Sequence, residues 1–380
     1  MKKLILFSLL LTVYQIKAQT WSALGSIPSG RHHPVTFSIN GIGYAVTGTN
    51  RFNQPTDDFF SYDPSTDSWS TLTNFPGKAR SFSIGTVVNG KAYIGFGADA
   101  VEYMRDLWSY DPATGNWTPL TSCPCAGRRH PAFIGIGDKI YAGLGDGLPG
   151  NLKDWWEYDI PTDTWKQITD LPGPERHHPY HFNAGGEVLA GFGHAGNFIY
   201  RDWYKLDTAT GSWTAVNLFP GEARVAGTQF SYNGFGFVLS GDGDNHSWMQ
   251  TGEMWRYNPS TDTWLQFPSH PGVSRWAPGS FEISGTVYFF GGLNRQTNQF
   301  PNDMWKFDLE AATISTAEYD WSQLNIYPNP TEGVIRISNS QDIQTMTLMN
   351  VGGQIIYQGA AKPAHDLSGL NAGVYFLHLS

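Results

Sequence analysis

The sequence predicts an all-β protein: a six-bladed β-propeller closed by its N-terminal strand, followed by a small C-terminal β-sandwich. The first observation is composition, because the 380 residues include 43 Gly, 15 Trp and 18 Tyr while only 15% are charged. That profile is typical of turn-rich β-proteins. The second observation is a pattern that recurs along the chain. The third is the set of tight-turn residues that separate its short apolar runs.

Two markers define the repeat. A Trp opens the last strand of each copy, with steps of 48 residues four times and 51 residues once. A Gly ends another apolar run in each copy. The tryptophans are Trp21, Trp69, Trp117, Trp165, Trp213 and Trp264, and the glycines are Gly48, Gly97, Gly145, Gly193, Gly241 and Gly292. Self-similarity at this period indicates a solenoid or a propeller.

Each repeat is expected to be an antiparallel meander of four strands, which we name a to d. Asn-Gly or Gly-Gly pairs at residues 40–41, 89–90, 185–186 and 233–234 supply the positive φ that a two-residue hairpin between a and b needs. An Asp-Pro turn, as in "WSYDPATGNWTPL" at 108–120, separates c from d. Four antiparallel strands per repeat, arranged radially, make a propeller.

The order of the strands predicts how the ring closes. The first d strand, at Trp21, precedes the first a strand, and the last c strand, "MWKFD" at 304–308, has no d strand after it. The N-terminal strand is therefore expected to complete the sixth sheet, which removes an otherwise open sheet edge.

The N-terminal segment predicts export. Lys2 and Lys3 precede an apolar run at 4–14, and Ala18 offers a small residue for cleavage, so residues 1–19 are interpreted as a signal peptide. The run is too short to span a membrane, and no transmembrane segment is expected in the mature chain. The remaining segments are assigned as the propeller at 20–312, a linker at 313–323 and a second domain at 324–380.

The repeat resembles the kelch motif. The resemblance rests on the apolar run that ends in Gly291-Gly292, the Trp-x-Tyr-Asp of strand c and the Trp of strand d, and it covers roughly residues 21–310. Five of the six double glycines are altered, as in "GFG" at 95–97, which makes the sequence a divergent member. The resemblance implies a β-propeller, and some kelch propellers are sugar mutarotases or copper-radical oxidases.

The second domain resembles the C-terminal sorting domains of the type IX secretion system of Bacteroidota. The residues that carry this resemblance are "YPNPT" at 327–331 with Gly333, the pair at 352–353 and "GVY" at 373–375. Such domains are small β-sandwiches that an outer-membrane translocon reads and that are often removed. The resemblance implies that the secretion machinery is a partner and that the protein is secreted or displayed on the cell surface.

Two positions in every repeat are predicted to be structural. Each copy has one Arg before strand a and one acid near the start of strand c, which suggests six Arg–carboxylate pairs beneath the loops. The arginines are Arg31, Arg80, Arg128, Arg176, Arg224 and Arg275, and the acids are Asp58, Asp106, Asp154, Asp202, Glu253 and Asp303.

The candidate ligand-binding residues lie where the repeats differ. Antiparallel order brings the d-to-a loops and the b-to-c loops to one face of the propeller, which we call the top face. The residues that follow the repeated Arg differ between copies and are rich in His, which suits hydrogen bonding, proton relay or metal binding. The candidates are His33, Arg129, His130, His177, His178, His194, His246, Trp248 and Trp276.

Metal and cysteine chemistry have weaker signals. Asp242 and Asp244, with His246 and Glu253, have calcium-loop spacing, but a Ser replaces the required Gly. No cofactor is predicted, and calcium or copper remain the alternatives, copper only through the oxidase resemblance. The two cysteines of the chain, at 123 and 125, would close a small strained ring if bonded to each other, and are interpreted as a local feature of a loop.

Two functions remain open. The first is a non-enzymatic binding module that holds a glycan or a surface protein on the top face, in keeping with the lack of a recognisable nucleophile–base pattern. The alternative is a carbohydrate-active enzyme, either a mutarotase or a galactose-oxidase-like protein. The net charge of -9, with no basic run, argues against a nucleic acid partner.

Overall fold

The computed structural model describes residues 5–7, 20–310, 325–338 and 345–379. The chain divides into two compact units, one of residues 19–312 and the other of residues 313–380 together with 1–18. The predicted linker at 313–323 lies outside the described residues, as does most of the predicted signal peptide.

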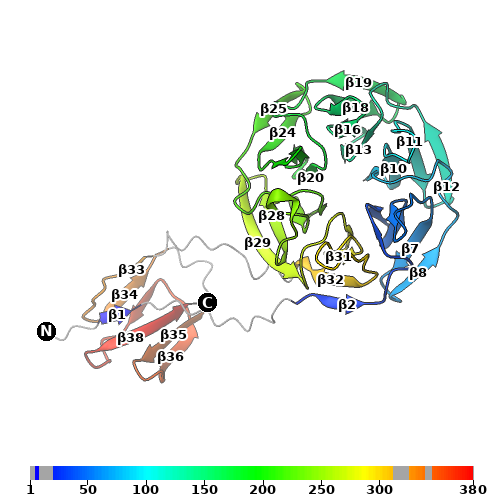
Figure 1. Ribbon diagram of the computed structural model, residues 1–380. Helices are drawn as coiled ribbons and strands as arrows, with labels where there is room; N and C mark the ends of the chain where they lie inside the picture. Colours follow the sequence, from blue (N-terminus) through cyan, green and yellow to red (C-terminus); the bar gives the residue numbers. More distant parts are fainter. Residues whose placement is uncertain (1–4, 8–19, 311–324, 339–344, 380) are drawn as a thin grey trace. The chain divides into compact units, whose positions relative to one another are not determined.

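The first unit is built mainly from four-stranded antiparallel sheets arranged in a ring, with smaller sheets of two or three strands in the connecting loops (Figure 1). Six four-stranded sheets lie within residues 22–308 of the described chain, and we number them as blades in the order of their a strands. Blade 1 contains β4 (Val35–Ile39), β5 (Ile42–Val46), β7 (Phe59–Asp63) and β8 (Ser68–Thr71); blade 2 contains β9 (Ile84–Val88), β10 (Lys91–Gly95), β11 (Leu107–Asp111) and β12 (Asn116–Leu120); blade 3 contains β14 (Ala132–Ile136), β15 (Lys139–Gly143), β18 (Trp155–Asp159) and β19 (Thr164–Ile168). Blade 4 contains β20 (Tyr180–Ala184), β21 (Glu187–Gly191), β24 (Trp203–Asp207) and β25 (Ser212–Ala215); blade 5 contains β26 (Thr228–Tyr232), β27 (Phe235–Leu239), β28 (Gly252–Asn258) and β29 (Thr263–His270); blade 6 contains β30 (Gly279–Ile283), β31 (Thr286–Phe290), β32 (Met304–Asp308) and β2 (Ser22–Leu24).

The a strands line the axis of the ring. Each a strand contacts the a strand of the next blade, in the order β4, β9, β14, β20, β26, β30 and back to β4. The last blade takes its d strand from the N-terminal segment, because β2 pairs antiparallel with β32 in the register Ser22↔Lys306 and Leu24↔Met304. The strand order agrees with the closure that the sequence predicts.

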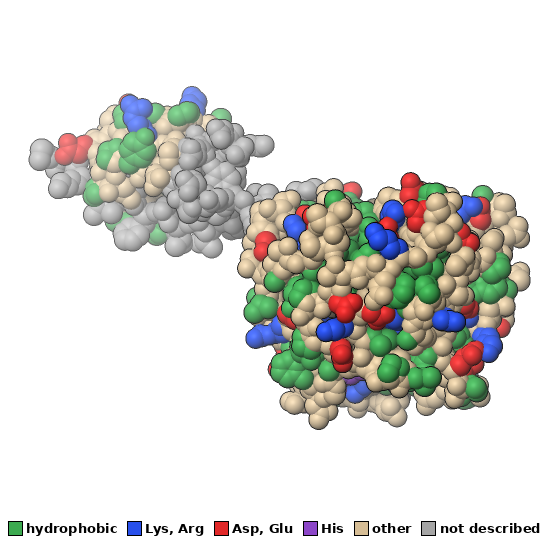
Figure 2. Space-filling model, turned by 90° about the horizontal axis from the view of Figure 1, so that it is seen from above, with side chains coloured by type: hydrophobic (Ala, Val, Ile, Leu, Met, Phe, Trp, Pro, Cys, Tyr) green, Lys and Arg blue, Asp and Glu red, His purple; other side chains and the backbone are tan. Residues whose placement is uncertain are grey.

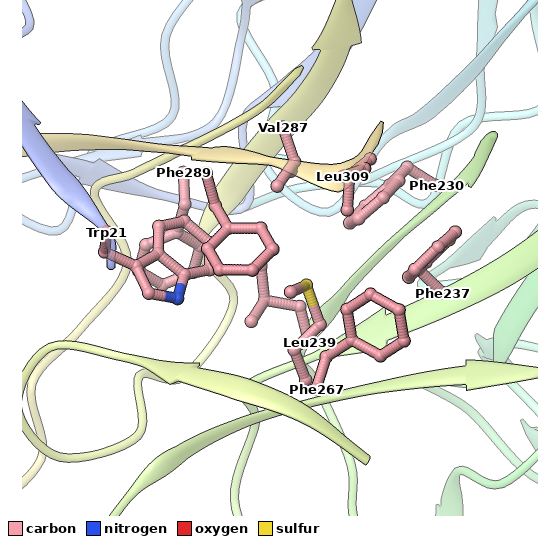
Figure 3. Close-up of a cluster of buried hydrophobic side chains, with 10 residues drawn as sticks. Trp21, Phe230, Phe237, Leu239, Phe267, Val287, Phe289 and Leu309 are labelled. Atoms are coloured by element: carbon pink, nitrogen blue, oxygen red, sulfur yellow. The ribbon is translucent and has the colours of Figure 1, made fainter. Parts of the chain in front are cut away.

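Trp21 anchors this closing strand in the core between blades 5 and 6 (Figure 3). Its ring centroid lies 6.0 Å from that of Phe289 and 5.3 Å from that of Phe307. Its indole Nε1 donates a hydrogen bond of 3.0 Å to the carbonyl of Pro268 in β29. The closing strand is therefore held by side-chain packing as well as by the backbone ladder.

The turns between a and b have the backbone that their sequence predicts. Asn40 and Gly41 have φ of 52° and 79°, the type I′ geometry whose twist matches paired strands. Ser284 and Gly285 form the equivalent turn of blade 6, with φ of 48° and 81°. We call the face that carries these turns the turn face. On the side wall between the two faces, acidic and basic side chains are interspersed (Figure 2).

The second unit is a small β-sandwich. One sheet has the order β33 (Ile326–Tyr327), β34 (Val334–Ile337), β37 (Ala364–Asp366), and the other has the order β1 (Ile5–Phe7), β38 (Val374–Leu379), β35 (Thr345–Asn350), β36 (Ile355–Ala360). Side chains of both sheets, such as Ile335 and Leu348, share one buried core. The described residues contain no helix with the length and apolarity needed to cross a membrane.

Candidate functional site

Six Arg–carboxylate pairs support the top-face loops. In blade 2, Nη1 and Nη2 of the buried Arg80 donate to the two carboxylate oxygens of Asp106 at 2.6 and 2.7 Å. Arg80 Nη1 also donates to the carbonyl of Phe96, which ties the d-to-a loop to the end of strand b. The other pairs are Arg31–Asp58, Arg128–Asp154, Arg176–Asp202, Arg224–Glu253 and Arg275–Asp303. Burial is the largest single influence on the pKa of Asp106 and raises it, but the hydrogen bonds and the charge of Arg80, together with a hydrogen bond from the Trp108 indole, outweigh burial and lower the pKa.

The residue directly after each repeated Arg is bridged to the residue that follows the marker Gly of the same blade. We call these six couples the mouth pairs, because they surround the entrance to the channel on the top face. They are His32–Thr49, Ser81–Ala98, Arg129–Asp146, His177–His194, Val225–Asp242 and Trp276–Leu293. The backbone bridge is common to all blades, whereas the side chains differ in every blade.

The second residue after each Arg lies at the axis. We call these six the axis positions, and all of them have φ between 47° and 63°. They are His33, Phe82, His130, His178, Ala226 and Ala277. Backbone N–H groups link neighbouring blades here, for example His130 N to Phe82 O at 3.1 Å and His178 N to His130 O at 3.3 Å. The positive φ therefore belongs to the fold, while three of the six side chains are imidazoles.

The histidines form a continuous string. His33 Nε2 lies 3.0 Å from His178 Nε2, and His178 Nδ1 lies 3.4 Å from His194 Nε2. The His130 ring is 3.4 Å from the His178 ring, and the His194 ring is 4.4 Å from the His246 ring, centroid to centroid. The structure thus brings together five histidines that are far apart in the sequence. Three of them follow the repeated Arg of blades 1, 3 and 4, and the other two lie in the b-to-c loops of blades 4 and 5.

Four imidazoles of the mouth, those of His33, His130, His177 and His178, are held neutral. Burial, with smaller contributions from the neighbouring His194 and Arg129, lowers the pKa of His177 to about 3. Burial likewise holds the pKa of His33, His130 and His178 well below the ordinary value for His, with the adjacent imidazoles and Arg129 adding to the effect. At neutral pH these four rings therefore offer lone pairs and N–H groups, without positive charge.

Two arginines stand at the mouth. Arg129 Nε lies 2.7 Å from Asp146 Oδ2, and Arg295 Nε lies 2.9 Å from Asp242 Oδ2. Arg295 also lies over the ring of Trp276, with its guanidinium carbon 5.0 Å from the centroid. Asp242 is buried, and burial raises its pKa to about 6 although Arg295 opposes the rise.

The calcium-loop residues do not converge. Asp242 pairs with Arg295, and Glu253 pairs with Arg224, so the two carboxylates serve different partners. Asp244 is exposed in a short 3₁₀ turn with His246. The groups of potential metal ligands in the described part of the chain are instead made of histidines.

The remaining candidates lie on the same face. His246 Nε2 donates toward the carbonyl of Gly196 at 3.1 Å, which links the b-to-c loops of blades 4 and 5. Trp248 is bridged to Asp242 within its own loop. Trp276 lies 4.5 Å from His33, ring centroid to ring centroid.

The channel continues below the axis positions as two cavities. The first, of about 140 Å³, is lined by the three axis histidines together with His181 and Gln229. The second, of about 350 Å³, lies nearer the turn face and includes Asn183 and Glu282 in its lining. Because polar groups project from several a strands, the channel can hold water or a small polar molecule.

His32 also follows a repeated Arg, so the sequence predicts it at the mouth beside His33, and its Nδ1 lies 2.7 Å from His33 Nδ1. Sequence reasoning missed three other residues of the mouth. Asn151 Oδ1 lies 2.7 Å from His177 Nδ1, and Asp146 and Arg295 supply the ion pairs described above. These three lie in b-to-c loops that share no pattern between repeats.

Cys123 and Cys125 form a disulfide in the loop between blades 2 and 3. Both side chains are buried in the core cluster that also contains Tyr158 and Phe133. The short spacing suggested a strained ring, but the disulfide is present. Its two buried side chains help to fill the core between blades 2 and 3.

Comparisons with known proteins agree with this architecture. A model of the kelch motif matches residues 30–76, and a model described as a secretion system C-terminal sorting domain matches residues 325–380. A solved structure titled "Structure of YjhT" is similar with a TM-score of 0.57 and 18% identity, over 67% of this chain and 89% of that chain. At this identity the likeness concerns the fold alone. No curated protein matches the chain.

The sorting domain marks the protein for export to the cell surface or beyond, and the secretion machinery that reads such domains is its partner. The four-stranded sheets of the first unit and the kelch motif agree with each other. The chain is a kelch-repeat β-propeller protein that carries a C-terminal sorting domain of the type IX secretion system.

Proposed function

We propose that the exported propeller is a binding module that holds a glycan or a surface protein on its top face. The observation that supports this best is the distribution of exposed apolar side chains. Among the described propeller residues, every large hydrophobic side chain that is exposed lies in a top-face loop: Phe52, Val101, Leu148, Phe198 and Leu218. These side chains lie in different loops of the same face, and loops held on a rigid scaffold are the usual place for a binding surface.

The surface around these side chains favours recognition. The Arg51 guanidinium lies over Phe52, with its carbon 4.9 Å from the ring centroid, and Phe198 packs 4.8 Å from Tyr200. Exposed aromatic rings can stack on a sugar or accept a peptide side chain. The polar mouth at the centre, with Arg129 and Arg295, would then fix the orientation of the ligand.

The experiment is a binding screen of the full chain against glycans and extracellular proteins. The Phe52→Ser, Phe198→Ser double variant should bind the selected ligand at least about 10-fold more weakly, because buried aromatic contacts dominate interfaces. The matched control is Ala113→Ser, which changes an exposed residue of the turn face. Equal loss of affinity in both variants would contradict a top-face site.

A carbohydrate-active enzyme is the second candidate, favoured by one observation. Neutral imidazoles that are hydrogen-bonded to one another, such as His33 and His178, can pass protons to and from a sugar. The test is sugar anomer interconversion followed by NMR, together with peroxide release for an oxidase. Turnover that disappears in His178→Ala but remains in Phe82→Ala would show that the propeller is an enzyme, not only a binding module.

A further inference from the structure

His177 and His194 form the mouth pair of blade 4, and they are held opposite each other by the backbone. His177 N donates to His194 O at 3.1 Å, and His194 N donates to His177 O at 3.0 Å. Their imidazole centroids lie 3.9 Å apart. His178, the next residue, offers a third ring nitrogen, and the three nitrogens lie within 4.8 Å of one another. The three histidines are therefore brought together before any ligand arrives.

The outer nitrogens of the mouth pair are tied to oxygen atoms. His194 Nδ1 lies 3.1 Å from the carbonyl of Gly196, which can only accept, so Nδ1 carries the hydrogen. His177 Nδ1 lies 2.7 Å from Asn151 Oδ1, while Asn151 Nδ2 donates to the His194 carbonyl at 3.4 Å, which fixes the amide orientation. In both neutral rings the lone pair must then lie on Nε2.

His178 can supply the third lone pair. Its Nε2 lies 3.0 Å from His33 Nε2, and its Nδ1 lies 3.4 Å from His194 Nε2. With the hydrogen on Nε2, His178 donates to His33, and Nδ1 is left free. His33 can then donate from Nδ1 to His32 Nδ1, 2.7 Å away. Each of the three rings thus has a partner for the nitrogen that a metal would not use.

We propose that His177 Nε2, His194 Nε2 and His178 Nδ1 bind one first-row transition-metal dication, for which Zn²⁺ is the probe. Three neutral imidazoles with a fourth coordination position left for water or a ligand are a known zinc arrangement. Ligating histidines almost always donate their other N–H to an acceptor, as these three can. The site does not depend on the proposed top-face ligand.

The charged groups nearest the triplet are paired. Arg129, whose charge disfavours positive charge at His177, forms an ion pair with Asp146, and Arg295 forms one with Asp242. These two carboxylates offset the repulsion that the arginines would exert on a bound cation.

A second triplet of histidines at the axis is less suited to a metal. His33, His130 and His178 also lie within 4.8 Å of one another. However, neither ring nitrogen of His130 has a hydrogen-bond partner among the described residues, so nothing holds its outer nitrogen. We therefore assign the ion to the blade 4 triplet.

The test is Zn²⁺ titration of the chelator-treated full chain by equilibrium dialysis, with Co²⁺ absorption as a second readout. The substitutions are residues that other blades carry at the same place: His177→Ser as at Ser81, His178→Ala as at Ala226, and His194→Ala as at Ala98. The fold therefore already accommodates each of them. The wild type should bind one Zn²⁺ ion per chain. Each variant should bind Zn²⁺ more than about 100-fold more weakly, because loss of a ligand costs more affinity than the roughly 10- to 100-fold lost with a residue that only hydrogen-bonds to a ligand.

Two kinds of control define the site. Asn151→Ala should weaken Zn²⁺ binding by about 10- to 100-fold, because it removes only the acceptor that orients His177. His365→Ala, which changes a histidine of β37 in the second unit, should bind Zn²⁺ as the wild type does. X-ray absorption of the wild-type zinc complex should show three imidazole ligands, and this measurement needs no variant to fold.

Three outcomes would overturn the proposal. One is the absence of saturable Zn²⁺ binding to the wild type. Another is loss of binding in His33→Ala and His130→Ala while His177→Ser and His194→Ala bind normally, which would move the ion to the axis triplet. The third is an absorption spectrum with fewer than three imidazoles.

Discussion

The indole Nε1 of Trp21 donates a hydrogen bond to the carbonyl of Pro268, 247 residues later in the chain, at 3.0 Å. This contact joins the first strand of the propeller to the outer strand of blade 5, next to the sheet that Trp21 itself helps to complete. The two ends of the repeat array are therefore held to each other and also to the neighbouring blade.

Replacing Trp21 by Ala should lower the free energy of unfolding by about 3–5 kcal/mol, the usual cost of truncating a buried aromatic side chain. Trp21 is only 9% exposed, and it packs on Phe289 and Phe307. The measurement is urea unfolding of the full chain followed by tryptophan fluorescence and circular dichroism. Phe52→Ala, at a side chain that is 67% exposed, is the control and should change stability by less than about 0.5 kcal/mol.

Replacing a repeated Arg should lower the free energy of unfolding, and Lys at the same position should restore only part of it. Arg176 is fully buried and pairs with Asp202, so Arg176→Ala leaves a carboxylate without its partner and should cost about 3–5 kcal/mol. Arg176→Lys should recover only part of this, because an ammonium cannot bind both carboxylate oxygens side by side. Thermal unfolding of the two variants checks the prediction, and equal stability of Lys and Arg proteins would refute it.

Acid should destabilise the propeller through buried histidines outside the mouth. Burial lowers the pKa of His270 to about 3 and that of His181 to about 4. Because the unfolded chain takes up these protons near pH 6.5, the stability they contribute is complete above that pH and is lost as pH falls toward 4. Between the unfolded and folded pKa values, each histidine lowers the free energy of unfolding by about 1.4 kcal/mol for every pH unit of acidification.

The charged groups that face His270 are Arg275, which lowers its pKa further, and Asp303, which raises it. The check is the urea midpoint at several pH values between 7.5 and 4.5, compared with that of His270→Gln. The variant should lose stability less steeply with acid, since Gln takes up no proton. Parallel curves for the two proteins would show that His270 titrates normally.

The interface between blades 1 and 6 should not tolerate a methyl group at Gly43. A Cβ there would lie 2.3 Å from the ring of Phe281 in β30, so Gly43→Ala should cost about 1–3 kcal/mol by overpacking. Adding Phe281→Leu should relieve part of this cost. Double-mutant thermal unfolding measures the coupling, and additive effects would mean that the two residues do not meet.

The repeat made much of the fold predictable. Periodic Trp and Gly residues indicated the sheets, and the missing d strand after Asp308 indicated that Trp21 would close the ring. The same comparison between copies distinguished Arg128, whose equivalent is an Arg in every blade, from His130, whose equivalent is not always a His. A position that varies while its neighbours repeat can be recognised from the sequence alone.

The geometry of the mouth could not be predicted in this way. Whether His177 meets His194 depends on a bridge between two loops, and no spacing rule fixes which side chains face each other there. Asn151 and Arg295 lie in b-to-c loops of different lengths, where copies cannot be aligned with one another. The disulfide between Cys123 and Cys125 likewise depends on the local path of one loop.

The pairing of β2 with β32 has a consequence for truncated chains. The residues that complete the final sheet, Met304–Asp308, are followed in the chain by the sorting domain at 325–380. A chain that ends before Met304 therefore leaves β2 without its partner strand and also lacks the sorting domain. Closure of the ring and recognition by the secretion machinery then fail together.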